Sequence, residues 1–206
     1  MRPQSSAAEI DRAADEIVRF TADLVRIPTV NPPGDDYEPC ARWLGDQLGG
    51  ARIRRRVHHR HRSARAHARH PRVNVVGTRR GDAAGPVVHL NGHFDVVPAG
   101  DGWTVDPFGG EVRDGRIYGR GVCDMKAGIA AAVFAAEAIR RAGVRLPGTI
   151  EISGTVDEES GGFAGVAWLV QHRPDREDAD RLRDHPRAAE RGSDLCRPPR
   201  RLLVRS

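Results

Sequence analysis

Three short stretches of the sequence place a histidine or carboxylates at the ends of apolar runs. His93 and Asp95 stand two residues apart in HLNGHFDVVP, and Asp124 precedes an alanine-rich run in GRGVCDMKAG. Glu158 and Glu159 follow an apolar run in GTVDEESGG. Imidazole and carboxylate groups are ligands for Zn²⁺ and similar divalent ions, and a carboxylate beside such an ion can accept a proton from water. These residue types therefore favour metal-assisted chemistry.

Each stretch taken alone also has a purely structural interpretation. His93 and Asp95 could form a surface hydrogen bond, since residues two apart on a strand point the same way. Asp124 could cap the N-terminus of a helix, and the two glutamates could lie in a solvated turn. In the functional interpretation, Asp95 holds one tautomer of His93 and Asp124 bridges two cations. Glu159 then binds metal, and Glu158 is a free general base.

The surrounding pattern predicts elements that would bring these residues to one edge of a sheet. Apolar periodicity predicts helices over residues 8–27, 37–48 and 125–142, strands over 73–78, 86–97 and 148–156, and the start of a helix after 161. Asp114-Gly115 predicts a two-residue hairpin turn. Strands that alternate with helices indicate an α/β sandwich with a largely parallel sheet. Such folds place their sites at the strand ends.

Length and composition limit the class of protein. The 206 residues suffice for one core, and no run of 18 apolar residues predicts a membrane span. The N-terminus lacks the apolar core of a secretory signal, which favours a cytoplasmic location. Cys40, Cys123 and Cys196 are far apart, so they are predicted to be reduced thiols.

The net charge of +5 suggests a nucleic-acid partner, but its distribution argues against one. Residues 51–68 contain seven Arg and no acid, which contributes +7. Residues 171–206 contain ten Arg and seven acids, which contributes +3, so the rest of the chain carries −5. We therefore expect no nucleic-acid partner, and a basic nucleic-acid-binding module is the weaker alternative function.

The three stretches occur in a fixed order, with 31 residues from His93 to Asp124 and 35 from Asp124 to Glu159. GHFDVVP, GWTVDPFGGEVRDGRIYGRGVCDMKAG and GTVDEESGG resemble the signature blocks of one family of co-catalytic zinc hydrolases. That family includes acetylornithine deacetylase, succinyl-diaminopimelate desuccinylase, aminoacylase and carboxypeptidase G. The resemblance implies a three-layer α/β/α zinc-exopeptidase-like catalytic domain. Residues 1–170 would form its N-terminal part, without the lid and dimerisation domain.

The resemblance also implies roles for the residues of this chain. His93 would bind one zinc, with Asp95 orienting its ring. Asp124 would bridge the two ions, Glu159 would bind the second, and Glu158 would be the general base. The implied reaction is hydrolysis of the amide bond of an N-acyl amino acid or small peptide with two Zn²⁺, for which Co²⁺ or Mn²⁺ are alternatives. Full-length relatives would be homodimers, and no membrane partner is implied.

The resemblance further implies ligands that this sequence does not supply. A carboxylate is expected 28 residues beyond Glu159, where Arg187 stands, and a late histidine is expected beyond Ser206. Each zinc would keep only two protein ligands, whereas catalytic zinc normally has three. We therefore expect weak metal binding and little or no activity from the chain as written, and a non-catalytic remnant is the alternative.

Two segments, 51–68 and 171–206, lack the family likeness. The first could be a basic solvated loop, a His-rich metal-binding tract or the product of a shifted reading frame. Its codons, read from their second base, can spell RGFDVEYITATGRPEHTP, a plausible strand and turn, and the second segment decodes in the same direction. We expect 51–68 to be out of frame and 171–206 to be an aberrant, disordered tail rather than a basic binding arm. The hypothesis would be contradicted if the coding DNA, read one base later, did not encode these sequences.

Overall fold

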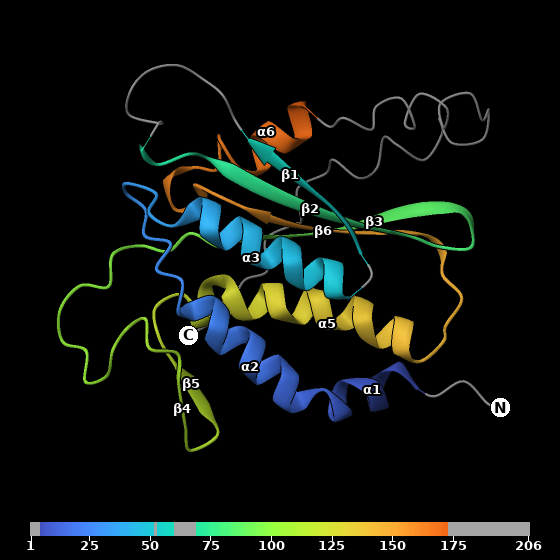
Figure 1. Cartoon of the computed structure of the whole chain (residues 1–206), viewed down its shortest axis with the longest axis horizontal. Coiled ribbons are helices and arrows are strands. Elements are labelled where there is room, and N and C mark those ends of the chain that lie inside the picture. Colours follow the sequence, from blue (N-terminus) through green and yellow to red (C-terminus); the bar gives the residue numbers. More distant parts are fainter. Residues whose placement is uncertain (1–4, 52, 60–68, 173–206) are drawn as a thin grey trace, which may run out of the picture. The chain divides into compact units, whose positions relative to one another are not determined.

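The computed structural model describes residues 5–51, 53–59 and 69–172 (Figure 1). The chain divides into two units, Met1–Leu169 and Val170–Ser206, and the fold below is that of the described residues of the first unit. The tail expected at 171–206 lies outside the described residues apart from its first two positions, so its disorder stays a prediction. Within the described part of the chain, every helix is too short or too polar to cross a membrane.

The helices follow the predicted pattern, with one exception at the N-terminus. The structure forms α1 (Ser6–Arg12), α2 (Ala14–Val25), α3 (Tyr37–Gly50), α5 (Ala127–Arg141) and α6 (Val166–Gln171). The helix predicted over 8–27 is broken at Ala13, which has φ −88° and ψ 4°. Both α1 and α2 contact α5, so the break allows each half to pack on the same neighbour. Periodicity within one helix does not report such a change of direction.

The main sheet contains four strands in the order β1-β2-β6-β3. The strands are β1 (Arg54–His59), β2 (Val73–Arg80), β3 (Ala83–His93) and β6 (Pro147–Thr155). β1 and β6 each pair antiparallel with β2, and only β3 and β6 are parallel. The prediction of a largely parallel sheet is therefore wrong. Two residues separate β2 from β3, too few for the crossover that a parallel pair requires, and β6 inserts between them.

β1 lies within the basic segment 51–68. Its backbone pairs with β2 from Arg54 opposite Thr78 to His59 opposite Val73. The solvated-loop alternative is therefore wrong for residues 54–59, while the rest of the segment, 60–68, lies outside the described residues. The strand does not distinguish the His-rich tract from the shifted frame.

The core lies between the sheet and the helices on one of its faces. Figure 1 shows α2, α3 and α5 below the sheet and α6 above it, which is the α/β sandwich expected from the sequence. Leu24, Leu44, Val75, Ile129 and Ile152 are among the fully buried residues of this core. Each such side chain contributes roughly 1.5–3 kcal/mol through burial. The core thereby fixes the strands whose ends carry the candidate site.

Two glycines allow helices to approach the strands that lead into the site. Gly92 directly precedes His93, and a Cβ at Gly92 would lie 2.7 Å from Cγ1 of Ile129 in α5. A Cβ at Gly154 would lie 2.5 Å from Cδ2 of Leu44 in α3. Because both positions lack a Cβ, β3 can pack closely against α5 and β6 against α3. This close packing fixes the position of the strand ends relative to the helices.

The predicted hairpin is confirmed. β4 (Glu111–Arg113) and β5 (Arg116–Tyr118) pair antiparallel, with Arg113 opposite Arg116. Asp114 and Gly115 have φ of 51° and 71°, as a type I′ turn requires at both central positions.

The two cysteines among the described residues differ sharply in environment. Cys40 is fully buried in α3, and burial raises the pKa of its thiol to about 12, whereas Cys123 is exposed. In a Cys196→Ser variant at pH 8, we expect a disulfide reagent to modify Cys123 at least about 10³-fold faster than Cys40, because thiolate is the reacting form. Cys40 should react at an ordinary rate once guanidinium unfolds the chain. Rapid modification of two thiols in the folded chain would contradict this assignment.

Candidate metal centre

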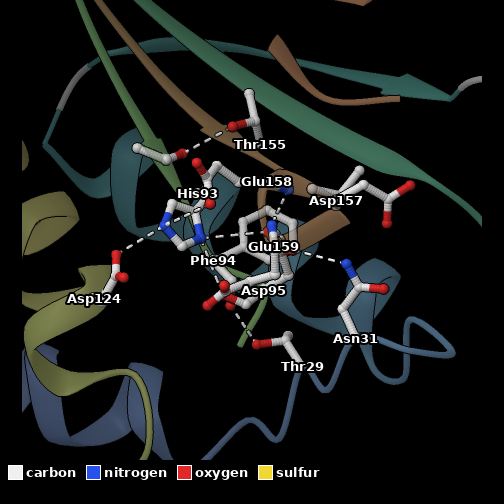
Figure 2. Close-up of polar contacts among 12 residues, drawn as sticks. Thr29, Asn31, His93, Phe94, Asp95, Asp124, Thr155, Asp157, Glu158 and Glu159 are labelled. Carbon is white, nitrogen blue, oxygen red and sulfur yellow. Dashed lines mark hydrogen bonds and ion pairs between the residues drawn. The ribbon is translucent and has the colours of Figure 1, made fainter. Parts of the chain in front are cut away.

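The ends of the parallel strands β3 and β6 meet at one edge of the sheet. His93, the last residue of β3, lies opposite Thr155, the last residue of β6. The backbone N–H of Phe94 donates to the carbonyl of Thr155 and keeps the two chains together beyond the strands. Asp95 therefore lies beside Glu158 and Glu159, as Figure 2 shows.

The imidazole of His93 is almost fully buried and is contacted at both nitrogens. Nδ1 lies 3.1 Å from the carbonyl oxygen of Asp95 and 3.4 Å from its Oδ1. Nε2 lies 3.1 Å from Oδ1 of Asp124 and 3.8 Å from Oε2 of Glu158 (Figure 2). One ring nitrogen is thus held by Asp95, and the other points towards two carboxylates from different segments.

The carboxylate environment determines the protonation of this ring. Burial lowers the pKa of His93, but hydrogen bonding to Asp95, the charge of Asp95 and the hydrogen bond to Asp124 outweigh it and raise the pKa to about 9. A cation that binds Nε2 would have to displace the proton from this ring, so metal binding is expected to weaken as the pH falls.

Asp95 is fully buried and organises the backbone of the acidic stretch. Its Oδ1 accepts the N–H of Glu158 at 3.2 Å, and its Oδ2 accepts the N–H of Glu159 at 3.1 Å and Nδ2 of Asn31 at 3.1 Å. Burial raises the pKa of Asp95, but these bonds and the His93 ring outweigh it, so its pKa is lowered. Asp95 therefore links the histidine to both glutamates.

Asp124 lies in the segment η1 (Val122–Lys126) that precedes α5. The helix-cap alternative is wrong, because α5 begins at Ala127 and Asp124 has the extended φ −125° and ψ 95°. Its side chain is 78% exposed, and its carboxylate contacts Nε2 of His93. The extended backbone turns this carboxylate out of the helix and towards the strand ends.

The two glutamates occupy different environments. Glu158 has a side chain that is 56% exposed and approaches His93. Burial raises the pKa of Glu159; the charge of His93 lowers it, while the charges of Asp124, Asp95 and Glu158 raise it further. Both side chains thus belong to one acidic cluster. The division of roles between them, with Glu159 as ligand and Glu158 as base, stays a prediction.

The donor set fits a divalent ion only in part. Two ligands of one tetrahedral Zn²⁺ at about 2.0–2.1 Å lie about 3.3 Å apart, and Nε2 of His93 and Oδ1 of Asp124 are 3.1 Å apart. Within residues 5–51, 53–59 and 69–172, however, no group of three or more His, Cys, Asp or Glu side chains is arranged as a complete metal site. The spacing of this one donor pair therefore suits a single ion, and among the described residues a third donor would have to move to complete the site.

Several residues around the site were missed by reasoning from the sequence. Asn31 donates to Asp95 and, at 2.9 Å, to Oγ of Ser160, and Asp157 receives hydrogen bonds from Tyr37 and Arg72. Asp157 directly precedes the glutamates, so proximity in sequence was a signal for this residue. Asn31, Tyr37 and Arg72 carry no such signal, because they reach the site only through the fold.

Comparison with known proteins gives consistent matches over most of the chain. Succinyl-diaminopimelate desuccinylase of Xanthomonas campestris pv. campestris (strain B100) is 36% identical over 191 residues, which cover 90% of this chain and 47% of the relative. The enzyme of the same name from Wolinella succinogenes is 45% identical over 87 residues, 42% of this chain and 23% of the relative. The chain thus spans about half the length, or less, of these curated relatives.

Solved structures agree with the fold. Human carnosine dipeptidase 1 matches with a TM-score of 0.68 and 27% identity, over 85% of this chain and 39% of that chain. The di-peptidase Dug1p from Saccharomyces cerevisiae matches with a TM-score of 0.67 and 20% identity, over 77% and 35%, and at this identity supports the fold alone. The model of peptidase family M20/M25/M40 matches residues 89–191, half of the chain, and this range includes all three signature stretches. The family resemblance inferred from the sequence is confirmed, and the chain belongs to peptidase family M20/M25/M40.

Proposed function

We propose that this chain carries the metal-binding and proton-transferring residues of an amidohydrolase that cleaves an N-acyl amino acid or a small peptide. The contact between Nε2 of His93 and Oδ1 of Asp124 carries the proposal, because it pairs an imidazole and a carboxylate from separate segments at one strand edge. Family membership implies use of a divalent metal ion. The desuccinylase and dipeptidase relatives support an amide bond next to a carboxylate-bearing amino acid as the target.

His93 and Asp124 would hold one ion, and Glu159 with Asp124 would hold a second. Zn²⁺, or Co²⁺ or Mn²⁺ in its place, would lower the pKa of a bound water towards ~7 and polarise the carbonyl of the substrate. Glu158, exposed and beside His93, would take a proton from water at its carboxylate and pass it to the leaving amine. Asp95 would keep His93 in one tautomer and hold the backbone of both glutamates.

Metal binding by the full chain tests the proposal. We expect Co²⁺ titration, followed by absorption spectroscopy, to reveal a weak site that His93→Ala removes. His70→Ala is the matched control, because His70 pairs with Asp35 outside the site and should leave binding unchanged. The His-rich segment is common to all three proteins, so the difference isolates His93. Equal Co²⁺ binding by the wild type and the His93→Ala variant would overturn the proposal.

The non-catalytic remnant remains the alternative, and hydrolysis separates the two. A chimera in which residues 89–170 replace the aligned segment of the Xanthomonas campestris desuccinylase should hydrolyse succinyl-diaminopimelate in a metal-dependent manner. A folded chimera that binds metal without hydrolysis would favour the remnant. The homodimeric state of the whole protein and a cytoplasmic location are further proposals that rest on the sequence.

A further inference from the structure

Asp157, the residue directly before the two glutamates, is buried and doubly anchored. Its Oδ1 accepts a hydrogen bond from the hydroxyl of Tyr37 at 3.0 Å, and its Oδ2 accepts one from Nε of Arg72 at 2.8 Å. Tyr37 begins α3, and Arg72 directly precedes β2. The carboxylate of Asp157 thus ties the start of the acidic stretch to two separate elements of the fold.

The partners of Asp157 are themselves held in place. Nη1 of Arg72 donates to the carbonyls of Pro33 at 2.9 Å and His70 at 2.8 Å, and its guanidinium lies 5.3 Å from the centre of the Tyr37 ring. Tyr37 is fully buried. Burial, with the charges of Asp95 and Asp157, raises the pKa of Tyr37, so its hydroxyl stays protonated and donates. These contacts restrict the movement of Tyr37, Arg72 and Asp157 relative to one another.

The backbone of Asp157 closes the loop that follows it. Its carbonyl accepts the N–H of Ser160 at 3.2 Å and the N–H of Gly162 at 2.6 Å. Asp157 itself has φ 61° and ψ 21°, a left-handed conformation that is unfavourable for a residue with a Cβ. The two hydrogen bonds of the Asp157 side chain compensate for the energetic cost of this backbone conformation. They also fix the orientation of the turn that follows.

The loop 157–162 is therefore held from two sides. Asp95 accepts the backbone N–H groups of Glu158 and Glu159, and Asp157 is gripped by Tyr37 and Arg72. We propose that Tyr37, Arg72 and Asp157 form a clamp that sets the direction in which this loop presents its two carboxylates to the His93 ring. They are positioning residues, and their importance for metal binding rests on the proposed function.

The clamp is tested with Tyr37→Phe in the full chain, a change that removes one oxygen atom. Tyr118→Phe is the matched control, because Tyr118 is the only other tyrosine and lies in β5. Two quantities are measured: amide hydrogen exchange in a peptide spanning 156–163 of the metal-free chain, and the Kd for Co²⁺. We expect Tyr37→Phe to raise both by about five- to tenfold, with exchange in β6 unchanged, and Tyr118→Phe to change neither.

Asp157→Asn provides a second variant, since it keeps the size of the side chain but removes the charge that Arg72 contacts. It should produce the same local increase in exchange and the same increase in Kd. A uniform loss of protection across the chain in both variants would overturn the clamp, because the network would then support the whole fold. Faster exchange at 156–163 with an unchanged Kd for His93-dependent Co²⁺ binding would also overturn it.

The experiment separates failure of the clamp from failure of the proposed function. If the wild type shows no Co²⁺ binding that depends on His93, the proposed function fails. The exchange measurement then still decides whether Tyr37, Arg72 and Asp157 fix the loop. If the wild type binds Co²⁺ through His93 and Tyr37→Phe changes neither quantity, the clamp alone is wrong.

Discussion

Glu158→Ala is expected to lower hydrolysis of succinyl-diaminopimelate by the chimera about 10²–10⁴-fold, the range that a general base contributes. The physical reason lies in how Glu158 is held. Asp95 fixes its backbone N–H, while its side chain is 56% exposed and lies 3.8 Å from His93. The carboxylate thus approaches the His93 ring and remains accessible to exchange a proton with water. Steady-state kinetics should show the loss in kcat.

The matched control is Glu111→Ala, a change of the same chemical type on β4, where Glu111 pairs with Arg113 outside the site. It should leave hydrolysis unchanged. Metal content, measured on the same samples, assigns the roles of the two glutamates. Glu158→Ala should retain its metal, whereas Glu159→Ala should lose part of it. A Glu158→Ala protein that loses metal would make Glu158 a ligand and reverse the assignment made from the sequence.

Lys126→Ala should destabilise the fold by about 3 kcal/mol and lower Tm by about 10 °C. Lys126 is the only lysine and is 0% exposed. Its Nζ donates to the carbonyls of Leu24 at 3.0 Å and Ile27 at 2.7 Å, at the C-terminal end of α2. These carbonyls lie at the negative end of the α2 dipole, where an ammonium group is favourable.

Opposing terms determine the size of this effect. Two charge-assisted hydrogen bonds contribute roughly 1.5–3 kcal/mol each, and the buried alkyl chain adds about 0.8 kcal/mol per methylene. Burial lowers the pKa of Lys126 from its ordinary 10.5 to about 8, which corresponds to a cost of roughly 3 kcal/mol for keeping it charged. The bonds and packing together exceed that cost, so removal of the side chain is destabilising.

Calorimetric unfolding of the full chain measures the change, with Arg145→Ala as the control. The Arg145 side chain is 88% exposed, so its removal should shift Tm by less than about 1 °C. Because Lys126 lies two residues after Asp124, the variant should also bind Co²⁺ more weakly in whatever fraction remains folded. A Lys126→Ala protein as stable as the control would show that the desolvation cost cancels the hydrogen bonds.

Local patterns in the amino-acid sequence were sufficient to predict most of the helices and strands and the kind of chemistry. Apolar periodicity located α3, α5, β2 and β6 to within a few residues, and Asp114-Gly115 specified its hairpin, because these patterns depend on neighbours close in the chain. The order and spacing of the three polar stretches predicted the family. The structure brings Asp95, Asp124 and Glu158 within 4 Å of the His93 ring, and Asp95 accepts the backbone N–H of Glu159. The roles of these residues stay a prediction.

Which segments meet could not be predicted from these local patterns. No periodicity in the sequence indicates that β6 lies between β2 and β3. The same holds for two long-range hydrogen bonds: Tyr37 to Asp157, 120 residues apart, and Lys126 to Leu24, 102 residues apart. Periodicity reports that one face of an element is buried but does not identify the partner that buries it. Pairing order and buried polar contacts depend on how all the elements pack together, so they emerge only when the chain is folded.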